Sequence, residues 1–426
     1  MMANDAFSEL EWRGLVYDST EGVREALARE SLTLYIGFDP TASSLHVGSL
    51  LPMMALARMQ RFGHSPIAIA GGGTGMIGDP SGKTAERQLL TVEQVDENLA
   101  GIRAQLATVL DFDAASNPAR IVNNADWLRP LKYLDFLRDI GKHFTVNYML
   151  AKESVKRRLE QEEGVSYTEF SYLMLQSYDF LTLYDRYGCT LQMGGSDQWG
   201  NITAGCDLVR KLRGAKAYGL VMPLVTTASG VKFGKTEAGA VWLDPARTSP
   251  FRFYQFWVNT DDRDTAAYLK SFTFLDRETI GALEAELVRA PEKREAQRVL
   301  AREVTRTLHG QGAVERAERA SALLFGERIA ELDADEIIAV FDDVPSTSVR
   351  RDQLGGSGLS TTEVLVAASL ASSKGEAARL VKGGGIYVNN RRVTDERGRI
   401  TMQDGISGRV IVLRKGARQY HLLRVE

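Results

Sequence analysis

Two segments far apart in the chain combine side chains that suit the binding of phosphate groups. The first, Pro40-Thr-Ala-Ser-Ser-Leu-His-Val-Gly-Ser49, follows an apolar run and precedes a helical pattern, so it lies where a strand passes into a helix. Backbone N–H groups and the helix dipole favour an anion at such a junction. The second segment, Lys232-Phe-Gly-Lys-Thr236, sets two lysines three residues apart. The hydroxyl, imidazole and ammonium groups come from Thr41, His46, Lys232, Lys235 and Thr236.

These residue types suit chemistry at a phosphate group, where the protein must align the reactants and stabilise charge on the phosphate oxygens. A lone histidine in the first turn of a helix is often structural, but the setting of His46 and the lysine loop downstream favour catalysis. The segment Gly78-Asp-Pro-Ser-Gly-Lys-Thr84 has one residue too few between its glycines to be a P-loop.

Three polar residues recur along one predicted helix. Tyr172, Gln176 and Asp179 are spaced by four and three residues within the otherwise apolar segment 170–180, so their side chains share one helix face. This pattern alone is compatible with a solvated stripe and with a polar face turned toward a ligand.

Two glycine-rich segments can bring the backbone close to a ligand. Residues 70–78 contain five glycines and end directly before Asp79. Residues 192–202 follow a strand pattern and start a helix, and Gly194 and Gly195 there leave room for a nucleoside. Both segments are therefore candidate binding loops.

Short apolar runs alternate with longer amphipathic segments through the first 245 residues. This alternation predicts βαβ units and a parallel sheet, with ligands at the carboxyl ends of its strands. Apolar residues at three- and four-residue spacing predict one long helix over 89–109. The predicted strands are 32–38, 66–70, 120–122, 190–193 and 220–225.

The remainder of the chain changes character twice. Charged helical patterns predict an α-helical domain over 249–341, and the polar residues 342–358 have the composition of a linker. After it we predict two short helices over 359–382, and then a turn, a strand and an Asn-Asn hairpin over 383–393. We therefore expect four parts: an α/β domain over 1–248, the helical domain, the linker, and a small α+β domain over 359–426.

Composition and charge limit the function further. Of 426 residues 44% are hydrophobic and 25% charged, which is ordinary for a globular protein of two or three domains. The net charge of −3 conceals a basic carboxyl-terminal segment, because residues 351–426 carry 13 Lys and Arg against 7 Asp and Glu. Such a segment favours a polyanion-binding module over a merely solvated face. Two cysteines without metal-ligand spacing, no secretory signal and no long apolar run predict a cytoplasmic protein.

The two phosphate-binding segments resemble the His-Ile-Gly-His and Lys-Met-Ser-Lys-Ser elements of class I aminoacyl-tRNA synthetases. The segments around Asp79, Asp179 and Ser196-Asp-Gln-Trp-Gly-Asn201 resemble those of the bacterial-type tyrosyl-tRNA synthetases, and residues 359–426 resemble an S4 RNA-binding domain. The resemblance implies a Rossmann-like catalytic domain, an α-helical anticodon-side domain and the S4-like domain. It also implies the formation of tyrosyl-adenylate from L-tyrosine and Mg2+-ATP, followed by transfer of tyrosine to tRNA(Tyr), with no tightly bound cofactor and no protein-bound metal site.

The resemblance also assigns roles to residues. Tyr35 and Asp179 would contact the phenolic hydroxyl of tyrosine, whereas Asp79, Tyr172 and Gln176 would contact its ammonium group and Gln198 its carboxylate. The ATP-binding residues would be Gly37, Asp39, His46, Gly48, Ser49, Gly195, Asp197 and Lys235, and the RNA-binding residues Lys374, Arg379, Lys382, Arg391 and Arg392. Ser49 departs from the family pattern, which has histidine there, so we expect a lower rate from this site.

Two other functions are compatible with part of the sequence. A nucleotidyltransferase of the same superfamily would lack Tyr35, Asp179 and the basic tail, and a non-catalytic RNA-binding relative would lose Lys232 or Lys235; all of these are present. The family is dimeric, and the aromatic-rich segment 127–148 is either an interface between two copies or a buried core helix.

Overall fold

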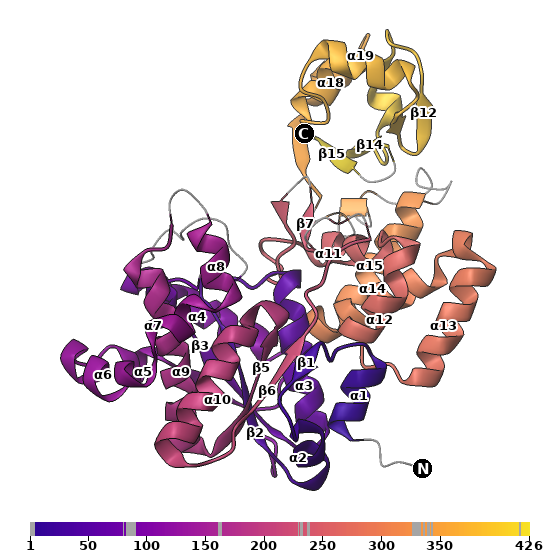
Figure 1. Cartoon of the computed structure of the whole chain (residues 1–426). Helices are drawn as coiled ribbons and strands as arrows, with labels where there is room; N and C mark the ends of the chain where they lie inside the picture. The colour runs from indigo at the N-terminus through magenta and orange to yellow at the C-terminus, as the bar shows by residue number, and fades with distance from the viewer. Residues whose placement is uncertain are drawn as a thin grey trace. The chain divides into compact units, whose positions relative to one another are not determined.

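The computed structural model describes residues 5–79, 81, 91–160, 164–228, 230, 233–236, 239–325, 334, 337–338, 341, 344–416 and 419–426. The chain divides into two compact units, Met1–Thr248 with Phe256–Leu308, and Ser249–Gln255 with His309–Glu426. Figure 1 shows the course of the chain through both units.

A six-stranded sheet forms the centre of the first unit. Its strand order is β1-β6-β5-β2-β3-β4, and every neighbouring pair is parallel except β1 with β6. All five predicted strands and their parallel arrangement are confirmed. Only the two-residue edge strand β1 was missed, because it is too short to show a pattern. The strands are β1 Asp18–Ser19, β2 Thr33–Phe38, β3 Ser65–Ala70, β4 Arg120–Asn123, β5 Cys189–Gly195 and β6 Tyr218–Met222.

Helices supply the apolar surfaces that bury this sheet. Two long helices, α9 and α10, pack against each other and against β5. Phe180 and Leu183 of α9 and Leu208 of α10 join Tyr35 and Ile67 of the strands in one core. Helix α3 packs on β2 and β3. The helices of this part are α1 Ala6–Trp12, α2 Val23–Arg29, α3 Leu50–Arg61, α4 Val92–Leu106, α5 Ala125–Leu128, α6 Tyr133–Asp139, α7 Val146–Leu150, α8 Glu153–Leu159, α9 Tyr167–Tyr187 and α10 Trp199–Arg213.

Local signals in the sequence set the ends of the long helices. The Ser166 side chain accepts a hydrogen bond from the backbone N–H of Glu169 and so caps α9, which ends at the left-handed Gly188 (φ 61°). Thr91 and Gln94 form a capping box at the start of α4. Helix α4 confirms the long helix predicted over 89–109.

The helical pattern after residue 249 is confirmed as far as the structure describes it. Five helices follow one another: α11 Pro250–Val258, α12 Asp262–Phe272, α13 Arg277–Arg289, α14 Glu295–His309 and α15 Gln311–Phe325. Because the two compact units divide within α11 and α14, these helices do not form one separate unit.

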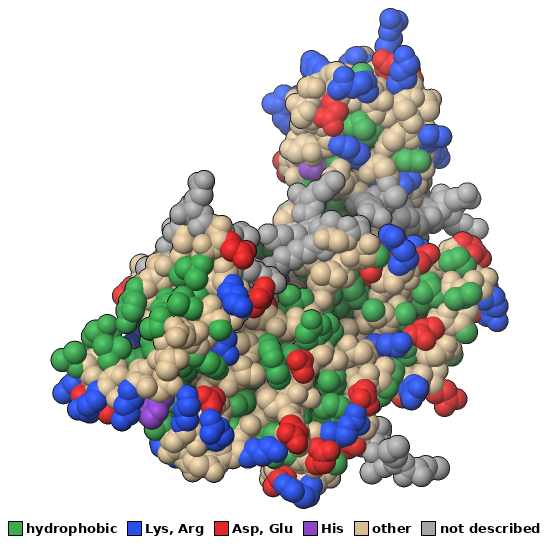
Figure 2. Space-filling view, viewed as in Figure 1, with side chains coloured by type: hydrophobic (Ala, Val, Ile, Leu, Met, Phe, Trp, Pro, Cys, Tyr) green, Lys and Arg blue, Asp and Glu red, His purple; other side chains and the backbone are tan. Residues whose placement is uncertain are grey.

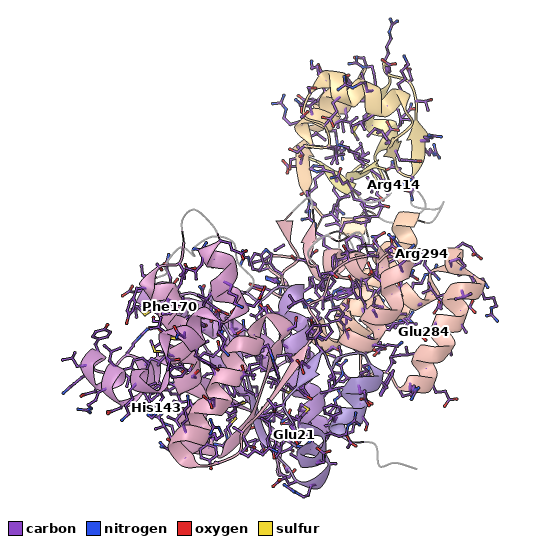
Figure 3. All side chains as sticks on the ribbon, viewed as in Figure 1. Glu21, His143, Phe170, Glu284, Arg294 and Arg414 are labelled. Carbon is purple, nitrogen blue, oxygen red and sulfur yellow. The ribbon has the colours of Figure 1, made fainter. Side chains whose placement is uncertain are left out.

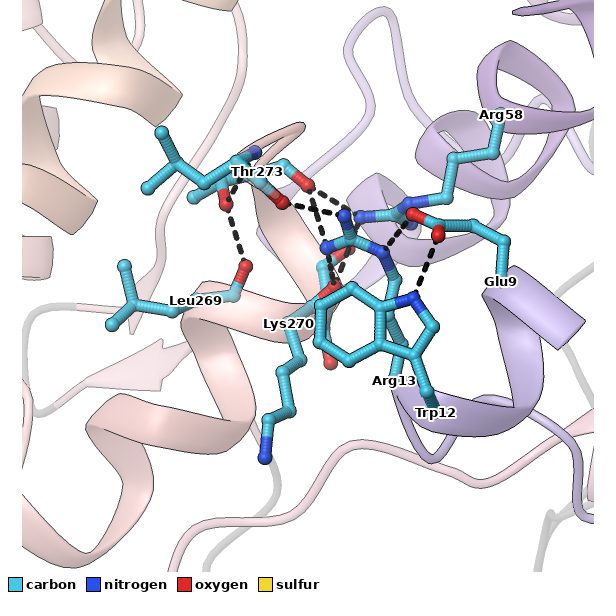
Figure 4. A network of polar contacts seen from close by, with 9 residues as sticks. Glu9, Trp12, Arg13, Arg58, Leu269, Lys270 and Thr273 are labelled. Atoms are coloured by element: carbon cyan, nitrogen blue, oxygen red, sulfur yellow. Dashed lines mark hydrogen bonds and ion pairs between the residues drawn. The ribbon is translucent and has the colours of Figure 1, made fainter. Parts of the chain in front are cut away.

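Two buried arginines, at the end of α1 and in α3, fix the end of α12 within the first unit (Figure 4). Arg58 of α3 donates to the carbonyl oxygens of Lys270, Ser271 and Thr273 at 2.7–3.0 Å, and Arg13 donates to those of Lys270, Thr273 and Leu275. These bonds satisfy carbonyl groups that the end of a helix leaves without a partner. Burial and the neighbouring Arg13 lower the pKa of Arg58 to about 9, so its guanidinium group stays charged at neutral pH.

The carboxyl-terminal residues form a five-stranded sheet in the order β12-β11-β14-β15-β9, covered by two helices. The predicted pair of helices and the Asn-Asn hairpin are confirmed, since Asn389 and Asn390 both have positive φ in the turn between β11 and β12. The elements are β9 Ser346–Val349, α17 Arg351–Leu354, β10 Leu359–Ser360, α18 Thr361–Ala367, α19 Lys374–Lys382, β11 Ile386–Val388, β12 Arg391–Val393, β13 Arg399–Ile400, β14 Val410–Lys415 and β15 Gln419–Val425.

Part of the predicted linker belongs to this sheet. Strand β9 pairs in parallel with β15, and Leu354 of α17 is buried in the core. The prediction of a linker is therefore wrong for residues 346–354. The polar composition of β9 suits an edge strand, and its partner lies some 75 residues later, which no local pattern reveals. Among the described residues, no helix is both long enough and apolar enough to span a membrane.

Candidate active site

The predicted site residues of the first unit lie around the switch point of the sheet, where the order of its strands reverses. Strands β2 and β5 are neighbours, and the chain leads from β2 to β3 on one side and from β5 to β6 on the other. Ligands bind at the carboxyl ends of strands at such a point. The segments after β2, β3 and β5 contain Asp39, Gly71 and Asp197 respectively.

The segment after β2 holds His46 in a defined state. The residue lies directly before the 3-10 turn Val47–Ser49, and its Nδ1 accepts a hydrogen bond of 2.9 Å from the backbone N–H of Gly48. A nitrogen that accepts a hydrogen bond carries no proton, so the neutral ring has its proton on Nε2 and can donate from there. Thr41 is exposed in the same segment, and Ser49 precedes α3 without a capping bond from its side chain.

The second predicted loop lies against this segment. Gly234 has φ +83°, and a Cβ atom added to it would lie 2.7 Å from Val47 and 3.3 Å from the backbone nitrogen of Gly48. Phe233 is buried among Phe256, Trp257, Tyr268 and Phe272, with ring centroids 4.9–5.8 Å away. The structure thus brings together the two segments that the sequence separates.

The lysines of this loop are described only in part. Lys232 lies outside the described residues. Lys235 and Thr236 form β7, which pairs with β8, Gly239–Ala240, but their side chains also lie outside what the structure describes.

Asp179 is the centre of a buried polar network. Its side chain is 3% exposed, Oδ1 accepts from the indole N–H of Trp127 at 2.7 Å, and Oδ2 accepts from the amide of Asn124 at 2.9 Å. Asn124 in turn bonds to Thr74 and to the backbone N–H of Gly73. Burial raises the pKa of Asp179 to about 7, although the two hydrogen bonds oppose this shift.

Two buried polar atoms beside this network have no partner among the described residues. They are the hydroxyl group of Tyr35 and Oε1 of Gln192. The two residues are register partners on β2 and β5, so their side chains point to the same face of the sheet. Tyr172 on the adjoining helix is also buried, and burial raises the pKa of its hydroxyl group well above the usual value. Unpartnered buried polar atoms are rare in native proteins and suggest a ligand group.

A second chain of hydrogen bonds joins three further residues predicted to bind tyrosine, namely Asp79, Gln176 and Gln198. The amide of Gln198 donates to Asp79 at 2.7 Å, and the amide of Gln176 donates to Gln198 at 3.2 Å. Asn201 donates to Gln176 at 3.0 Å and contacts Ser81. The polar face of α9 is therefore turned inward, which resolves the alternative that the sequence left open.

The predicted nucleoside-binding residues lie at the ends of the strands. Gly37 is exposed within β2, and the half-buried Asp39 follows it. A Cβ atom on Gly71 would lie 2.7 Å from a carboxylate oxygen of Asp39, and one on Gly195 would lie 2.6 Å from a carboxylate oxygen of Asp197. Each carboxylate thus lies against a backbone that only glycine allows to come so close.

The predicted RNA-binding residues lie in the second unit, on α19 and the β11–β12 hairpin. All five are exposed. Lys374 pairs with Glu363 at 2.7 Å, Lys382 with Glu396 at 3.7 Å, and Arg392 donates to the carbonyl of Gly384. Figure 2 shows several Lys and Arg side chains on the visible face of this carboxyl-terminal part. Arg414, labelled in Figure 3, lies over the ring of Tyr387 at 3.7 Å.

Four functional candidates were missed in the sequence: Asn124, Trp127, Gln192 and Asn201. Asn124 directly precedes the short helix α5 and Trp127 lies on it; this helix shows no periodic pattern, and only the contacts with Asp179 reveal the two residues. Gln192, a polar residue within an apolar strand, was the one available signal. Among the residues that the structure describes, no three His, Cys, Asp or Glu side chains are grouped so as to hold a metal ion.

Comparison with known proteins agrees with this geometry. Residues 27–326 match the family model of tRNA synthetases class I (W and Y), and residues 336–423 match that of the tyrosine–tRNA ligase SYY-like C-terminal domain. The chain is 58% identical over 417 residues to the tyrosine–tRNA ligase of Roseiflexus castenholzii, covering 98% of each protein. It is 53% identical over 423 residues to that of Geobacillus stearothermophilus, covering 99% of each.

Solved structures show the same fold. A C-terminally truncated mitochondrial tyrosyl-tRNA synthetase of Aspergillus nidulans is 31% identical with a TM-score of 0.69, covering 76% of this chain and 94% of that one. A tryptophanyl-tRNA synthetase of Encephalitozoon cuniculi, 15% identical with a TM-score of 0.52, shares the fold over 78% of this chain and 90% of that one. From its motifs, its fold and these relatives, the chain belongs to the bacterial-type tyrosine–tRNA ligases of class I, also called tyrosyl-tRNA synthetases.

Proposed function

We propose that the two polar networks beside α9 bind L-tyrosine at its two ends. Asp179 and Tyr35 hydrogen-bond the phenolic hydroxyl group, Asp79, Tyr172 and Gln176 hold the ammonium group, and Gln198 contacts the carboxylate. The observation that carries this assignment is the hydroxyl of Tyr35, which has no partner among the described residues and lies near the Asp179 carboxylate that Asn124 and Trp127 hold in place. A substrate hydroxyl completes this arrangement, because it can donate to Asp179 and accept from Tyr35.

The activation step follows from the second set of residues. A tyrosine carboxylate oxygen attacks the α-phosphorus of ATP, the new O–P bond forms, and the bond to pyrophosphate breaks. Thr41, His46, Lys232, Lys235 and Thr236 stabilise the charge on the phosphate oxygens. Gly37, Asp39, Gly48, Ser49, Gly195 and Asp197 contact ATP. In the second step a ribose hydroxyl at the 3′ end of tRNA(Tyr) attacks the carbonyl carbon of tyrosyl-adenylate, and AMP leaves.

Magnesium enters this scheme as part of the substrate. The carboxylate of Asp79 is already engaged, since Gln198 and the backbone N–H of Ser81 both donate to it. Mg2+ would therefore be held by the triphosphate of ATP, whose charge it neutralises. It needs no site made by the protein alone.

The other parts of the chain serve the tRNA. We assign residues 1–248 to catalysis, 249–341 to the anticodon side and 359–426 to RNA binding through Lys374, Arg379, Lys382, Arg391 and Arg392. Arg379 and Arg391 are exposed, and no hydrogen bond or ion pair ties them to a described carboxylate, so they suit phosphate contacts best. A cytoplasmic location stays a prediction of the sequence.

The enzyme also acts as a homodimer in this proposal. Large apolar side chains of α6 to α9 are exposed on the catalytic part: Tyr133, Leu134, Val146, Leu159 and Tyr167 are 49–76% exposed. Hydrophobic side chains gather over α6 and α7 in Figure 2. Exposed apolar patches of this kind mark interfaces, whereas Trp127, Phe136 and Ile140 of the predicted interface segment belong to the core.

Amino-acid-dependent ATP–pyrophosphate exchange, measured without tRNA over all twenty amino acids, tests the activation step. Exchange with tyrosine alone supports the assigned pocket. No exchange with any amino acid would refute the catalytic assignment and would identify Ser49 as the mark of an inactive site. The third outcome is exchange with tyrosine whose selectivity over phenylalanine is the same in Asp179→Asn and Tyr35→Phe as in the unsubstituted protein. That outcome would refute only the roles of these two residues.

A further inference from the structure

The segment that follows the second loop is paired with the segment that carries His46. The backbone N–H of Val47 donates to the carbonyl of Val241, and that of Leu243 donates to Leu45, each at 2.9 Å. His46 and Trp242 are therefore opposite each other in an antiparallel bridge. The backbone N–H of Val241 also donates to Gly234 at 3.1 Å, so one stretch of chain contacts both phosphate-binding segments.

The side chains continue this pairing. The indole ring of Trp242 meets the imidazole of His46 edge to face, with ring centroids 6.2 Å apart and an interplanar angle of 69°. The guanidinium carbon of Arg247 lies 3.5 Å from the centroid of the Trp242 ring, and the backbone N–H of Trp242 donates to Thr248. The backbone bond to Thr248 and the guanidinium group of Arg247 thus hold the indole ring of Trp242 in place. The ring in turn limits the rotation of the His46 imidazole.

Two contacts now define the orientation of His46. The Gly48 N–H fixes Nδ1, which leaves the proton on Nε2, and the Trp242 ring restricts the plane in which Nε2 can point. A hydrogen bond to a phosphate oxygen depends strongly on direction. A displaced imidazole would therefore lose most of its effect on the transition state even though the residue is still present.

We infer that Trp242, held by Arg247, is a positioning residue that orients the imidazole of His46 toward ATP. The inference rests on the proposed role of His46 in the activation step. It adds a residue from the segment that follows Lys232–Thr236 to the residues that determine the rate of activation. Trp242 itself touches neither reacting group in this scheme, so its effect must pass through His46.

The test is the rate constant of tyrosyl-adenylate formation in a single turnover of the full chain, at saturating tyrosine and varied ATP. We expect Trp242→Ala to lower it about 10- to 100-fold, the range for a small misplacement of a catalytic group. The dissociation constant of tyrosine should change by less than about twofold, because the residues assigned to tyrosine binding are not altered. Trp242→Phe, which keeps an aromatic edge, should restore most of the rate. Trp12→Ala is the matched control, since it removes another half-buried indole of the same unit.

A double-mutant cycle distinguishes positioning from general damage. If Trp242 acts through His46, the double variant Trp242→Ala/His46→Ala is no slower than His46→Ala alone. Losses that multiply, or a loss in Trp12→Ala equal to that in Trp242→Ala, would overturn the inference while the role of His46 stands. An unchanged rate in His46→Ala would instead refute the proposed role of His46, and the inference with it.

Discussion

The substitution Asp179→Asn gives the sharpest test of how this protein selects tyrosine. Asp179 is buried, and its two oxygens accept from Trp127 and Asn124. Asparagine offers one acceptor oxygen and one donor group in the same place. One of the two protein N–H donors would then face an NH2 group, and the phenolic hydroxyl of tyrosine would lose a charged acceptor.

The size of the effect follows from the charge of the lost acceptor. A hydrogen bond to a charged group contributes about 1.5–3 kcal/mol, which corresponds to roughly 10- to 150-fold in kcat/KM. Phenylalanine has no hydroxyl group, so it loses only what disorder in the Asn124–Trp127 network costs, and tyrosine loses that too. The ratio of the two kcat/KM values should therefore fall by about 10- to 150-fold. Rejection of a substrate that lacks one hydroxyl group is an effect for which tyrosyl-tRNA synthetases are a well-known example.

The assay is ATP–pyrophosphate exchange with each amino acid, over pH 6 to 8. Burial raises the pKa of Asp179 from its usual 3.8 to about 7, so the carboxylate becomes protonated as the pH falls through 7 and loses acceptor strength. The tyrosine-to-phenylalanine ratio should fall toward pH 6 in the original protein and stay level in the variant. Other titrating groups affect both amino acids and cancel in the ratio. A ratio that is unchanged by Asp179→Asn would show that Asp179 does not face the hydroxyl group.

Four further substitutions test separate parts of the structure. Tyr35→Phe should lower the same ratio by only about 2- to 12-fold, because its hydrogen bond is neutral, and thermal unfolding should show no loss of stability, because the hydroxyl has no partner among the described residues. Phe233→Ala should slow adenylate formation by removing the aromatic anchor of the lysine loop, with Phe233→Leu less affected and unchanged tyrosine binding as the measured control. Arg58→Met should lower the free energy of unfolding by roughly 2–4 kcal/mol in urea titrations, since it removes one donor from three carbonyl groups at the end of α12, of which only two still accept from Arg13; a loss below about 1 kcal/mol would contradict the role given to the network. Leu134→Glu should shift the sedimentation coefficient toward the monomer, and an unchanged value would place the interface elsewhere.

Local patterns in the sequence predicted the elements but not all of their partners. The five parallel strands, α4 and the Asn-Asn hairpin each have a periodicity or a turn signal within about ten residues, and all were found. The inward direction of the polar residues of α9 was not decidable from spacing, because a solvated stripe has the same period. Contacts with Asn201 and Asn124, which come from other elements, decide it.

Residues that act through long-range contacts left no local signal. Trp127 appeared only as part of an aromatic-rich segment, and its hydrogen bond to Asp179 spans 52 positions. Strand β9 looked like linker because an edge strand needs few apolar residues. Trp242 is an ordinary aromatic residue until the bridge to His46 is seen. Family resemblance supplied the signature residues, but not the neighbours that hold them.

The buried polar groups that we assign to tyrosine binding link specificity to stability. A buried polar atom without a partner costs about 1–3 kcal/mol, and neither the Tyr35 hydroxyl nor the Gln192 oxygen has a partner among the residues that the structure describes. The raised pKa of Asp179 lowers the free energy of unfolding further at neutral pH. The unfolded chain releases its proton near pH 4 but the folded protein only near pH 7, so the free energy of unfolding decreases as the pH rises through that window.

A ligand that satisfies these groups should recover part of that free energy. Tyrosine should therefore raise the midpoint of thermal unfolding more than phenylalanine does at equal concentration, because stabilisation grows with the ratio of ligand concentration to its dissociation constant. The difference should shrink in Asp179→Asn, without any ATP present. Agreement between this equilibrium measurement and the exchange ratio would locate discrimination in the binding of tyrosine. A kinetic difference without a difference in stabilisation would locate it in the transition state of activation, where Asp179 and Tyr35 would act only after ATP has bound.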